Sequence, residues 1–412
     1  MEQEYRFGEL EAMGERRGFC PVCNGRLSAC RPAVCPFVKR LSAWISTERF
    51  RDRTVFGASP PTVFVGEWGY PKVNIGPALS TMGKEVAGIL DAHERWLEFS
   101  MGELLFMRLS LLHGKKRASV AEARMPSRLV ESFQELAMSS KPVDAEMELE
   151  SRPTLKPSFH VREPPIGPSA PILKVRLAEN PSVPRPVEKA VSDSDLRATD
   201  AILSMYRSGI KQEQVTRLLS AGLLGMKGER KMVPTEWSIT AVDDVIGRAL
   251  RGEVLRYPLI DCYEVYGFEA LHNRVHILLL PFRWAFEVLE YWHSMPTELP
   301  YADHEYPSFP ERYPENIGGA YHAVRLPVLE HLSARRRQAA AIVFVEVFPG
   351  WLPLGVWRLR EISRKALGMR CLKASTLGEA LSLLSSKSSL PIEKWTCASW
   401  LLGFLKGQSR LG

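Results

Sequence analysis

The sequence contains no long apolar run. Its main apolar segments, at residues 277–282 and 339–345, stop at Arg283 and Glu346, far short of the ~20 residues that a membrane-spanning helix needs. The first residues also lack the basic, apolar and small-residue order of a secretory signal. We therefore exclude a membrane protein and expect a cytoplasmic protein in a reducing compartment, where structural disulfides are disfavoured.

Several catalytic fingerprints are also missing. The chain has no G-x-x-x-x-G-K-S/T, no G-x-G-x-x-G, no G-x-S-x-G and no H-E-x-x-H motif. These absences disfavour ATP-driven motor activity, nicotinamide redox chemistry of the usual kind and metalloprotease activity. Asn and Gln are scarce, at five and six residues, which fits a thermophilic source.

The composition is that of a globular protein with more than one domain. With 412 residues, of which 45% are hydrophobic and 25% charged, the chain exceeds what one core usually serves. Apolar periodicity predicts an α+β fold. Helices are expected at 36–50, 84–113, 127–138, 195–207, 211–221, 240–251, 284–292, 320–336, 356–367 and 377–385. Strands are expected within 56–77 and near 173–177, 260–266, 275–280 and 340–348. Ten of the 30 prolines lie within 139–195, which is typical of a linker or an extended crossing segment.

Four of the seven cysteines lie within sixteen residues, in a C-x2-C-x6-C-x4-C spacing. A C-x2-C pair presents two thiolates to one metal ion, and the short return supplies two more. A disulfide pair or four unrelated thiols would explain the residues less well. We expect a structural zinc ion with a closed coordination sphere. Its ligands would be Cys20, Cys23, Cys30 and Cys35.

Positive charge is concentrated in the same region. The segment from Arg16 to Arg53 has a net charge of +7, which equals the net charge of the whole chain, so the remainder is balanced. Such asymmetry is typical of a polyanion-binding surface, usually for nucleic acid, although a solvated basic face explains it about equally well. The candidate phosphate contacts are Arg26, Arg31, Lys39, Arg40, Arg49 and Arg51.

Two polar stretches are candidates for a functional site. Residues 67–74 combine acidic, aromatic and basic side chains on a glycine-hinged loop and strand, which suits base stacking and phosphate contact. The candidates there are Glu67, Trp68, Tyr70 and Lys72. Residues 237–244 end in Asp243 and Asp244, which could bind a metal ion. Turn chemistry for the first stretch, and capping of a helix from Thr240 for the second, are the competing explanations.

A pair of histidines does not predict a second metal site. His272 and His276 flank the start of a predicted strand, four residues apart. On a strand they would face the same side but lie ~13 Å apart, too far to share one ion.

Several long motifs occur along the chain. They are Cys20-Pro-Val-Cys23, F-V-G-E-W-G-Y-P-K-V-N-I-G-P at 64–77, G-P-S-A at 167–170, V-P-T-E-W-S-I-T-A-V-D-D at 233–244, G-G-A-Y-H-A-V-R at 318–325, R-Q-A at 337–339 and P-L-G-V-W-R-L-R-E at 353–361. In this order they resemble the motifs of the archaeal Nre proteins, which are implicated in DNA damage repair. The family often has a basic residue where this chain has Glu236, which weakens a phosphate-binding role for that position.

The resemblance implies a small N-terminal zinc module on a larger two-part α/β body in a cytoplasmic archaeal protein. The expected parts are a basic four-cysteine module at 1–36, an N-terminal family domain at 37–295 that includes the proline-rich segment 139–195, a C-terminal family domain at 296–405 and a mobile tail at 406–412. The linker interpretation of 139–195 is replaced accordingly.

The family resemblance also bears on partners. Family members often end in a Q-x-x-L-x-x-aromatic-aromatic peptide that engages the sliding clamp PCNA. Gln408 and Leu411 have the required spacing, but the aromatic pair is missing, so we expect weak clamp binding.

We therefore expect a DNA repair accessory factor that binds DNA through the basic zinc module. The alternative is an enzyme that acts on nucleic acid or a nucleotide at a polar site formed by 67–74 and 237–244, with Glu67, Lys72, Asp243 and Asp244 as candidate catalytic residues. A protein-binding scaffold for repair complexes is a third hypothesis, and whether the chain is an enzyme stays open.

Overall fold

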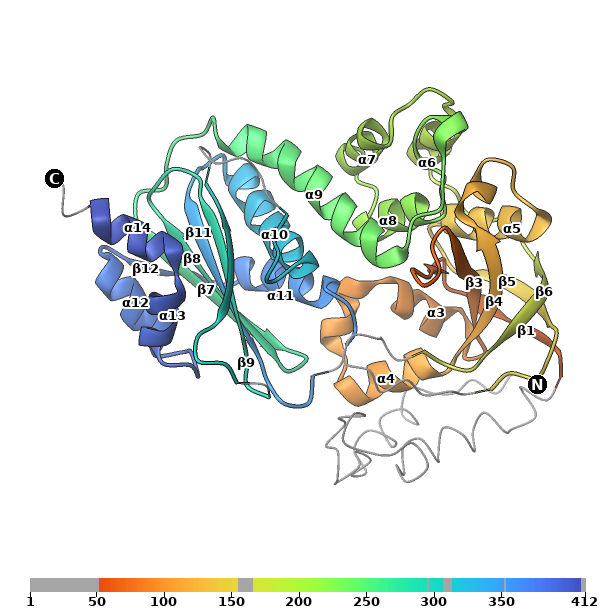
Figure 1. Ribbon diagram of the computed structural model, residues 1–412, viewed down its shortest axis with the longest axis horizontal. Coiled ribbons are helices and arrows are strands. Elements are labelled where there is room, and N and C mark those ends of the chain that lie inside the picture. The colour runs from red at the N-terminus through yellow and green to blue at the C-terminus, as the bar shows by residue number, and fades with distance from the viewer. Residues whose placement is uncertain (1–51, 155–165, 295, 307–312, 352, 409–412) are drawn as a thin grey trace. The chain divides into compact units, whose positions relative to one another are not determined.

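The computed structural model describes residues 52–154, 166–294, 296–306, 313–351 and 353–408 (Figure 1). These residues form two compact units of mixed helices and sheets, as the sequence predicts. The first comprises the described residues up to Val242 with residues 353–354, and the second comprises those from Asp243 to Trp351 and from Gly355 onward. The boundary falls inside one helix, whereas the family resemblance places its domain boundary at 295/296. The expected zinc module lies outside the described residues.

Strands of the first unit form a closed barrel. They are β1 (Thr54–Ser59), β2 (Val63–Val65), β3 (Lys72–Ser80), β4 (Leu111–Ser119), β5 (Val143–Leu149) and β6 (Ser169–Leu177). The strand order is β1-β5-β6-β4-β3, and β1 also pairs with β3 at Ala58 and Ser80, which closes the ring. The β4–β6 pair is parallel and the other pairs are antiparallel, with β2 added outside β3.

This connectivity is that of the OB fold, a five-stranded Greek-key barrel. Strands β1, β3, β4, β5 and β6 take the places of its first to fifth strands, and the helix α5 (Arg128–Met138) lies between the third and the fourth. Two glycines permit the close approach of neighbouring strands. A Cβ at Gly57 would lie 2.6 Å from the Ser80 carbonyl oxygen, and one at Gly76 would lie 1.7 Å from that of Gly114.

The barrel strands alternate between a buried interior and an outer surface. On β3, Val73 and Ile75 are fully buried, while Lys72 and Asn74 between and beside them are exposed. The remaining helices of this unit are α3 (Gly83–Asp91), η3 (His93–Glu98), α4 (Met101–Leu109), η4 (Val120–Ala123), α6 (Arg185–Ser192), α7 (Ala198–Arg207), α8 (Gln212–Ser220) and η5 (Lys227–Glu229), followed by the start of α9 (Thr235–Val254).

The second unit is a six-stranded mixed sheet with helices on both faces (Figure 1). Its strand order is β10-β9-β11-β8-β7-β12. The strands are β7 (Tyr263–Ala270), β8 (Asn273–Leu280), β9 (Phe286–Trp292), β10 (Tyr301–Glu305), β11 (Ala340–Val347) and β12 (Leu372–Ala374). One face is covered by α10 (Gly319–Arg335) and α11 (Trp357–Leu367), and the other by α12 (Leu377–Ser385), α13 (Ile392–Ala398) and α14 (Trp400–Gln408).

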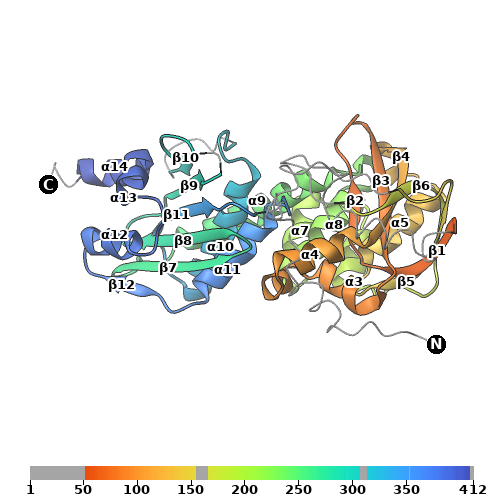
Figure 2. The same ribbon diagram turned by 90° about the horizontal axis from the view of Figure 1, so that it is seen from below.

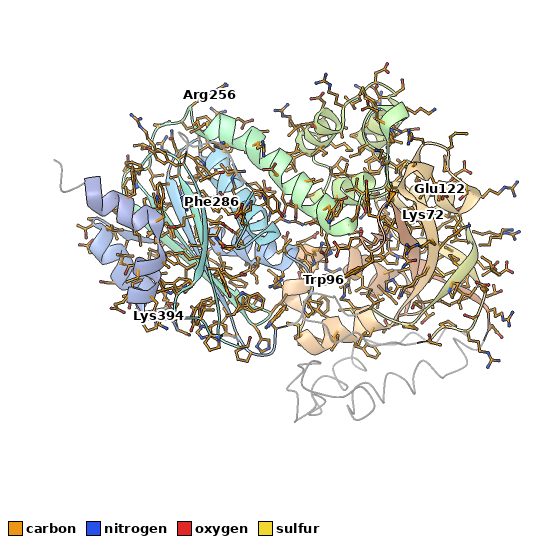
Figure 3. All side chains as sticks on the ribbon, in the orientation of Figure 1. Lys72, Trp96, Glu122, Arg256, Phe286 and Lys394 are labelled. Carbon is orange, nitrogen blue, oxygen red and sulfur yellow. The ribbon has the colours of Figure 1, made fainter. Side chains whose placement is uncertain are left out.

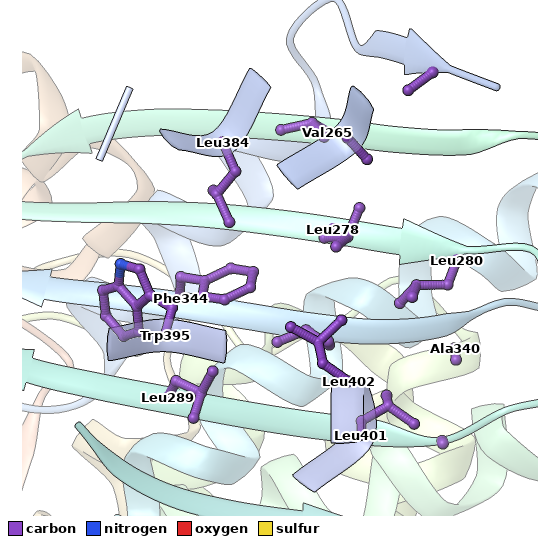
Figure 4. Close-up of a cluster of buried hydrophobic side chains, with 14 of the residues drawn as sticks. Val265, Leu278, Leu280, Leu289, Ala340, Phe344, Leu384, Trp395, Leu401 and Leu402 are labelled. Atoms are coloured by element: carbon purple, nitrogen blue, oxygen red, sulfur yellow. The ribbon is translucent and has the colours of Figure 1, made fainter. Parts of the chain in front are cut away.

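The hydrophobic core of the second unit lies between the sheet and helices α12 to α14 (Figure 4). Phe344 on β11 packs against Trp395 on α13, with ring centroids 5.4 Å apart in an edge-to-face arrangement. Trp395 is fully buried, and its indole N–H donates to the Ser388 hydroxyl at 2.9 Å, so its one polar group is satisfied.

Three secondary-structure predictions are wrong. The predicted helix at 284–292 is the strand β9, which lies between β10 and β11 and is buried on both faces, so it lacks the alternation that marks a strand. The predicted helix at 84–113 is broken into α3, η3 and α4, and residues 111–113 begin β4. The predicted helix at 240–251 begins five residues earlier, at Thr235, because the Ser238 amide donates to the Pro234 carbonyl.

The proline-rich segment is ordered over much of its length. Within 139–195 the structure has β5, β6 and α6, and the strand predicted at 173–177 is part of β6. No helix among the described residues has the length and apolar character needed to cross a membrane.

Candidate nucleic-acid interface

The first candidate stretch forms a tight turn between β2 and β3. The Tyr70 amide donates to the Glu67 carbonyl at 3.2 Å, and the Lys72 amide donates to the Gly69 carbonyl at 2.9 Å. Gly69 has a φ of +82°, a conformation that glycine adopts without strain. At the base of the turn the Gly66 amide donates to the Asn74 carbonyl at 2.8 Å. The backbone therefore fixes the direction of the side chains that the turn carries.

Large aromatic side chains are exposed on this turn. Trp68 is 76% exposed and Tyr70 is 47% exposed. Trp237, at the start of α9, is 49% exposed, and its ring centroid lies 5.5 Å from that of Tyr70, with the ring planes tilted by 40°. We call Trp68, Tyr70 and Trp237 the aromatic platform. It joins the turn to the first residues of the second candidate stretch.

Hydrogen bonds to the barrel hold the start of α9 in place. The Val65 amide on β2 donates to the Thr235 hydroxyl at 3.0 Å, and the Met232 amide donates to the Val120 carbonyl at 2.9 Å. The Val120 amide in turn donates to Pro71 of the turn, at 2.9 Å. Segments 170 residues apart in sequence thus share one surface of the first unit.

Basic side chains lie next to the aromatic platform. Lys72 begins β3, and Figure 3 shows it on the first unit. Asn74 pairs in register with Arg117 on β4, both exposed. A Cβ at Gly69 would lie 2.2 Å from Nη2 of Arg117, so the guanidinium group lies against the turn. Within the described part of the chain, no carboxylate forms a salt bridge with Lys72, Lys116 or Arg117.

Two carboxylates, those of Glu67 and Glu236, interact electrostatically beside the same platform. Crowding by the surrounding chain, and then the negative charge of Glu67, raise the pKa of Glu236 above its usual value, although Glu236 is exposed at the surface. An anionic ligand would therefore meet local repulsion here. A base edge would instead meet two hydrogen-bond acceptors.

Asp243 belongs to a buried ion pair of the second unit. Its Oδ1 accepts from Nη1 of Arg360 at 2.8 Å, and both side chains are almost fully buried. Because α9 begins at Thr235, Asp243 stands in the third helical turn, so the helix-capping interpretation is wrong for it. Its role as a catalytic residue stays a prediction.

Asp244 forms ion pairs on the same helix and with α10. Its Oδ2 accepts from Nε of Arg248 at 2.7 Å, and its Oδ1 lies 3.4 Å from Nδ1 of His322. Burial acts to raise the pKa of Asp244, but the hydrogen bond and charge of His322 and the charge of Arg248 outweigh it and lower the pKa. A catalytic role for Asp244 likewise stays a prediction.

The other predicted site residues are differently placed. The four cysteines and the basic residues Arg26, Arg31, Lys39, Arg40, Arg49 and Arg51 lie outside the described residues. Helix α14 continues to Gln408, beyond residue 405, and Leu411 lies outside.

The two histidines that were considered as a metal site lie apart in the fold. His276 is on β8 opposite Phe344, whereas His272 lies in the β7–β8 turn. In the part of the chain that is described, no group of His, Cys, Asp and Glu side chains could hold a metal ion.

Sequence reasoning missed the basic side chains contributed by β4. The run Lys115-Lys116-Arg117 is visible in the sequence, but its place beside the turn depends on the pairing of β3 with β4, which brings Arg117 opposite Asn74. Trp237 lies in the second candidate stretch, but the sequence does not indicate that it contacts Tyr70. Its contact with Tyr70 depends on the tie between β2 and α9.

Comparison with known proteins identifies similar sequences over most of the chain. The family models described as "Archaeal Nre, N-terminal" and "Archaeal Nre, C-terminal" match residues 29–297 and 308–412. The chain is 36% identical over 389 residues to "DNA repair protein NreB" of Archaeoglobus fulgidus, covering 93% of this chain and 96% of that protein. It is 36% identical over 359 residues to "DNA repair protein NreA" of Haloferax volcanii, covering 81% and 85%. No solved structure matches.

Proposed function

The chain belongs to the archaeal Nre family, and from this premise we propose that it acts in DNA repair as a DNA-binding accessory factor. Two relatives with most of their length covered carry the name DNA repair protein. The observation that supports DNA binding is the aromatic platform with its neighbouring basic residues on the first unit.

The exposure of the platform supports a binding role. A Trp side chain that is three-quarters exposed, as Trp68 is, buries too little area to stabilise the fold much. Exposed aromatic rings beside Lys and Arg side chains that form no salt bridge are typical of protein surfaces that bind nucleic acid. On such surfaces aromatic side chains stack on bases, and Lys and Arg contact phosphates. Lys72 and Arg117 supply such cations, and Asn74 supplies an amide.

A second DNA contact is proposed for the basic N-terminal segment. Its support is the net charge of +7 between Arg16 and Arg53 and the C-x2-C-x6-C-x4-C spacing. Four thiolates would close a structural zinc site. Elemental analysis is expected to give one zinc per chain, and replacing Cys20 and Cys23 by Ser is expected to release it. A metal-free wild-type chain would contradict this part of the proposal.

The DNA-binding test uses the full chain and labelled DNA at several salt concentrations. Lys72→Ala and Arg117→Ala are expected to reduce the slope of log affinity against log salt, since each lost phosphate contact removes ~0.7 from it on single strands and ~0.9 on duplex. Lys174→Ala, at an exposed position of β6, is the matched control. Unchanged affinity and slope in both variants would show that DNA does not bind at this surface.

Contact with the sliding clamp PCNA is proposed only as a weak interaction through Gln408 and Leu411. Calorimetric titration of the clamp is expected to give low affinity that is lost when residues 406–412 are deleted. Tight binding that survives the deletion would place a clamp site elsewhere on the chain.

A further inference from the structure

We propose that the DNA ligand is a single strand, which lies across the outer face of β3 and β4 with its bases stacked on the aromatic platform. This inference rests on the DNA binding proposed above and specifies its form. The occupant of the surface is thus single-stranded DNA.

The position of the platform within the barrel is the first reason. In a barrel of this connectivity, the loop between the first and second strands and the face of the second and third strands are where oligonucleotides bind. Here that loop contains Trp68 and Tyr70, and that face is formed by β3 and β4. The two strands lie side by side, with β2 along the other edge of β3 (Figure 2). The aromatic and cationic residues therefore gather where this topology leaves a binding surface.

The exposed rings favour a single strand over a duplex. Bases in a duplex are stacked on one another, so a protein ring can reach a base face only where the bases are unpaired. Tyr70 and Trp237 are tilted rather than parallel, and each keeps about half of its surface exposed. Trp68 is more exposed than either. The platform thus offers exposed aromatic surface on which unpaired bases can stack.

Charge on the outer barrel surface favours a path along one pair of strands. Lys72 and Arg117 are exposed on β3 and β4, and Arg117 pairs with Asn74 on the outer face. The outer positions of β5 carry Glu146 and Glu148, which pair with Arg176 and Lys174 of β6, so these two strands have no excess charge there. A phosphate backbone is attracted more strongly to the cations of β3 and β4 than to this balanced surface.

The backbone that carries the platform is held in place before any ligand arrives. The hydrogen bonds of the turn and the tie from Val65 to Thr235 fix both halves of the platform to the barrel. Stacking on side chains that are already in place loses less conformational entropy than stacking on mobile ones. Stacking is therefore expected to add to the salt-dependent phosphate contacts of Lys72 and Arg117.

The test measures fluorescence anisotropy of the full chain with three labelled probes: an oligothymidine of about 12 nucleotides, within the ~4–16 that one such barrel covers, a duplex of equal length, and the matching oligouridine. We expect the single-stranded DNA to bind most tightly. Trp68→Ala and Tyr70→Ala should each weaken it by about tenfold, while duplex binding changes little. Tyr301→Ala is the matched control, because Tyr301 in the second unit is 46% exposed, almost the same as Tyr70.

The possible outcomes separate this inference from the proposed function. Duplex binding as tight as single-strand binding, with no loss in either variant, overturns the inference but leaves a DNA-binding protein. Tighter binding of oligouridine overturns the assignment to DNA. Failure to bind any of the three probes overturns both. Melting temperatures of the variants are measured first, so that a loss of affinity is not a loss of folding.

Discussion

Gly69 and Gly209 both adopt positive φ, at +82° and +76°, but only Gly69 has another side chain against it. Replacement by Ala should cost each about 1 kcal/mol of folding free energy, because a Cβ is strained in this region. At Gly69 the new Cβ would also displace the Arg117 guanidinium, since it would lie 2.2 Å from Nη2. At Gly209 no heavy atom outside the neighbouring residues lies within 4 Å of the added Cβ.

We therefore predict similar melting temperatures for Gly69→Ala and Gly209→Ala but different DNA affinities. Gly69→Ala should bind single-stranded DNA several-fold more weakly than wild type, because a phosphate contact is misplaced, and Gly209→Ala should bind like wild type. Thermal melting and anisotropy measure the two effects separately. Equal affinities would show that Arg117 does not contact the ligand.

The acidic pair beside the platform gives a second residue-level prediction. Glu236→Gln removes a negative charge near the proposed phosphate path, so single-strand affinity should rise roughly threefold, within the range of exposed charge effects. Because the pKa of Glu236 is raised, the wild-type carboxylate takes up its proton at a higher pH than an ordinary Glu. Wild-type affinity should consequently rise as pH falls, and the variant should show less of this rise.

Glu188→Gln, at an exposed position on α6, is the control for the Glu236 prediction. It removes the same charge from the net balance at a position away from the platform turn. If both variants gain affinity equally, the effect comes from overall charge, and the local repulsion at Glu236 is not responsible.

At the scale of elements, the docking of helix α14 depends on one buried carboxylate. Glu287 on β9 accepts from the Ser399 hydroxyl, from the Trp400 amide at 2.7 Å and from the Leu401 amide at 3.3 Å. Burial raises the pKa of Glu287 to about 7, and these donors only partly offset it. A pKa raised in the folded state means that the folded chain binds this proton more tightly than the unfolded chain.

Stability from Glu287 should therefore be complete below pH ~4.5 and lost as the pH rises through about 7. The effect is on the order of 3 kcal/mol across this window. Glu287→Gln removes the titrating group but loses one accepted hydrogen bond, because its NH2 cannot accept from a backbone amide. The melting temperature of wild type should therefore fall between pH 5 and pH 8 more than that of the variant does. A wild-type melting temperature that falls between pH 5 and pH 8 no more than that of Glu287→Gln would contradict the assignment.

Helices with a regular apolar pattern are predicted well from this sequence, whereas fully buried strands are predicted less well. The amphipathic helices α5 and α11 and the largely buried helix α10 fall within two residues of their predicted bounds. Strand β9 was predicted as a helix because nearly every residue of it is buried, which removes the two-residue alternation. The sequence shows where apolar residues lie, but the number of sheet faces that are covered depends on tertiary structure.

The candidate interface was only partly predictable for a related reason. Trp68, Tyr70 and Lys72 lie within one short segment, so composition alone indicates them. Arg117 and Trp237 reach the same surface through strand pairing and a hydrogen bond between distant segments, which no local pattern specifies. Asp243 and Asp244, in the same family motif as Trp237, form ion pairs in the second unit instead.

At the scale of the whole molecule, two surfaces are proposed to bind DNA by different physical means. The N-terminal segment from Arg16 to Arg53 has a net charge of +7, equal to that of the whole chain, and the barrel presents aromatic rings. Reversing Arg26, Arg31, Arg40 and Arg49 to Glu should weaken duplex binding strongly and flatten its salt dependence. The preference for single strands should then increase, because stacking on the platform is retained.

Titrations of this quadruple variant with duplex and single-stranded probes at three salt concentrations test the division. The matched control reverses four exposed basic residues elsewhere, namely Arg185, Lys189, Arg256 and Lys373. If the quadruple variant and the control behave alike, the N-terminal segment is a solvated basic face. If single-strand affinity falls as much as duplex affinity, the two surfaces are not independent.

Closure of the barrel also sets the order of events during synthesis. Strand β1 pairs with β5 from Thr54 opposite Glu148 to Ser59 opposite Val143, a separation of about 90 residues. At ~5–20 residues per second, the ribosome produces β5 roughly 5–20 s after β1. During that interval β1, with Val55 and Phe56, has no completed barrel to join. The edge of β1 that pairs with β5 therefore stays unpaired for seconds in the nascent chain, and the barrel can close only after β6 has been synthesised.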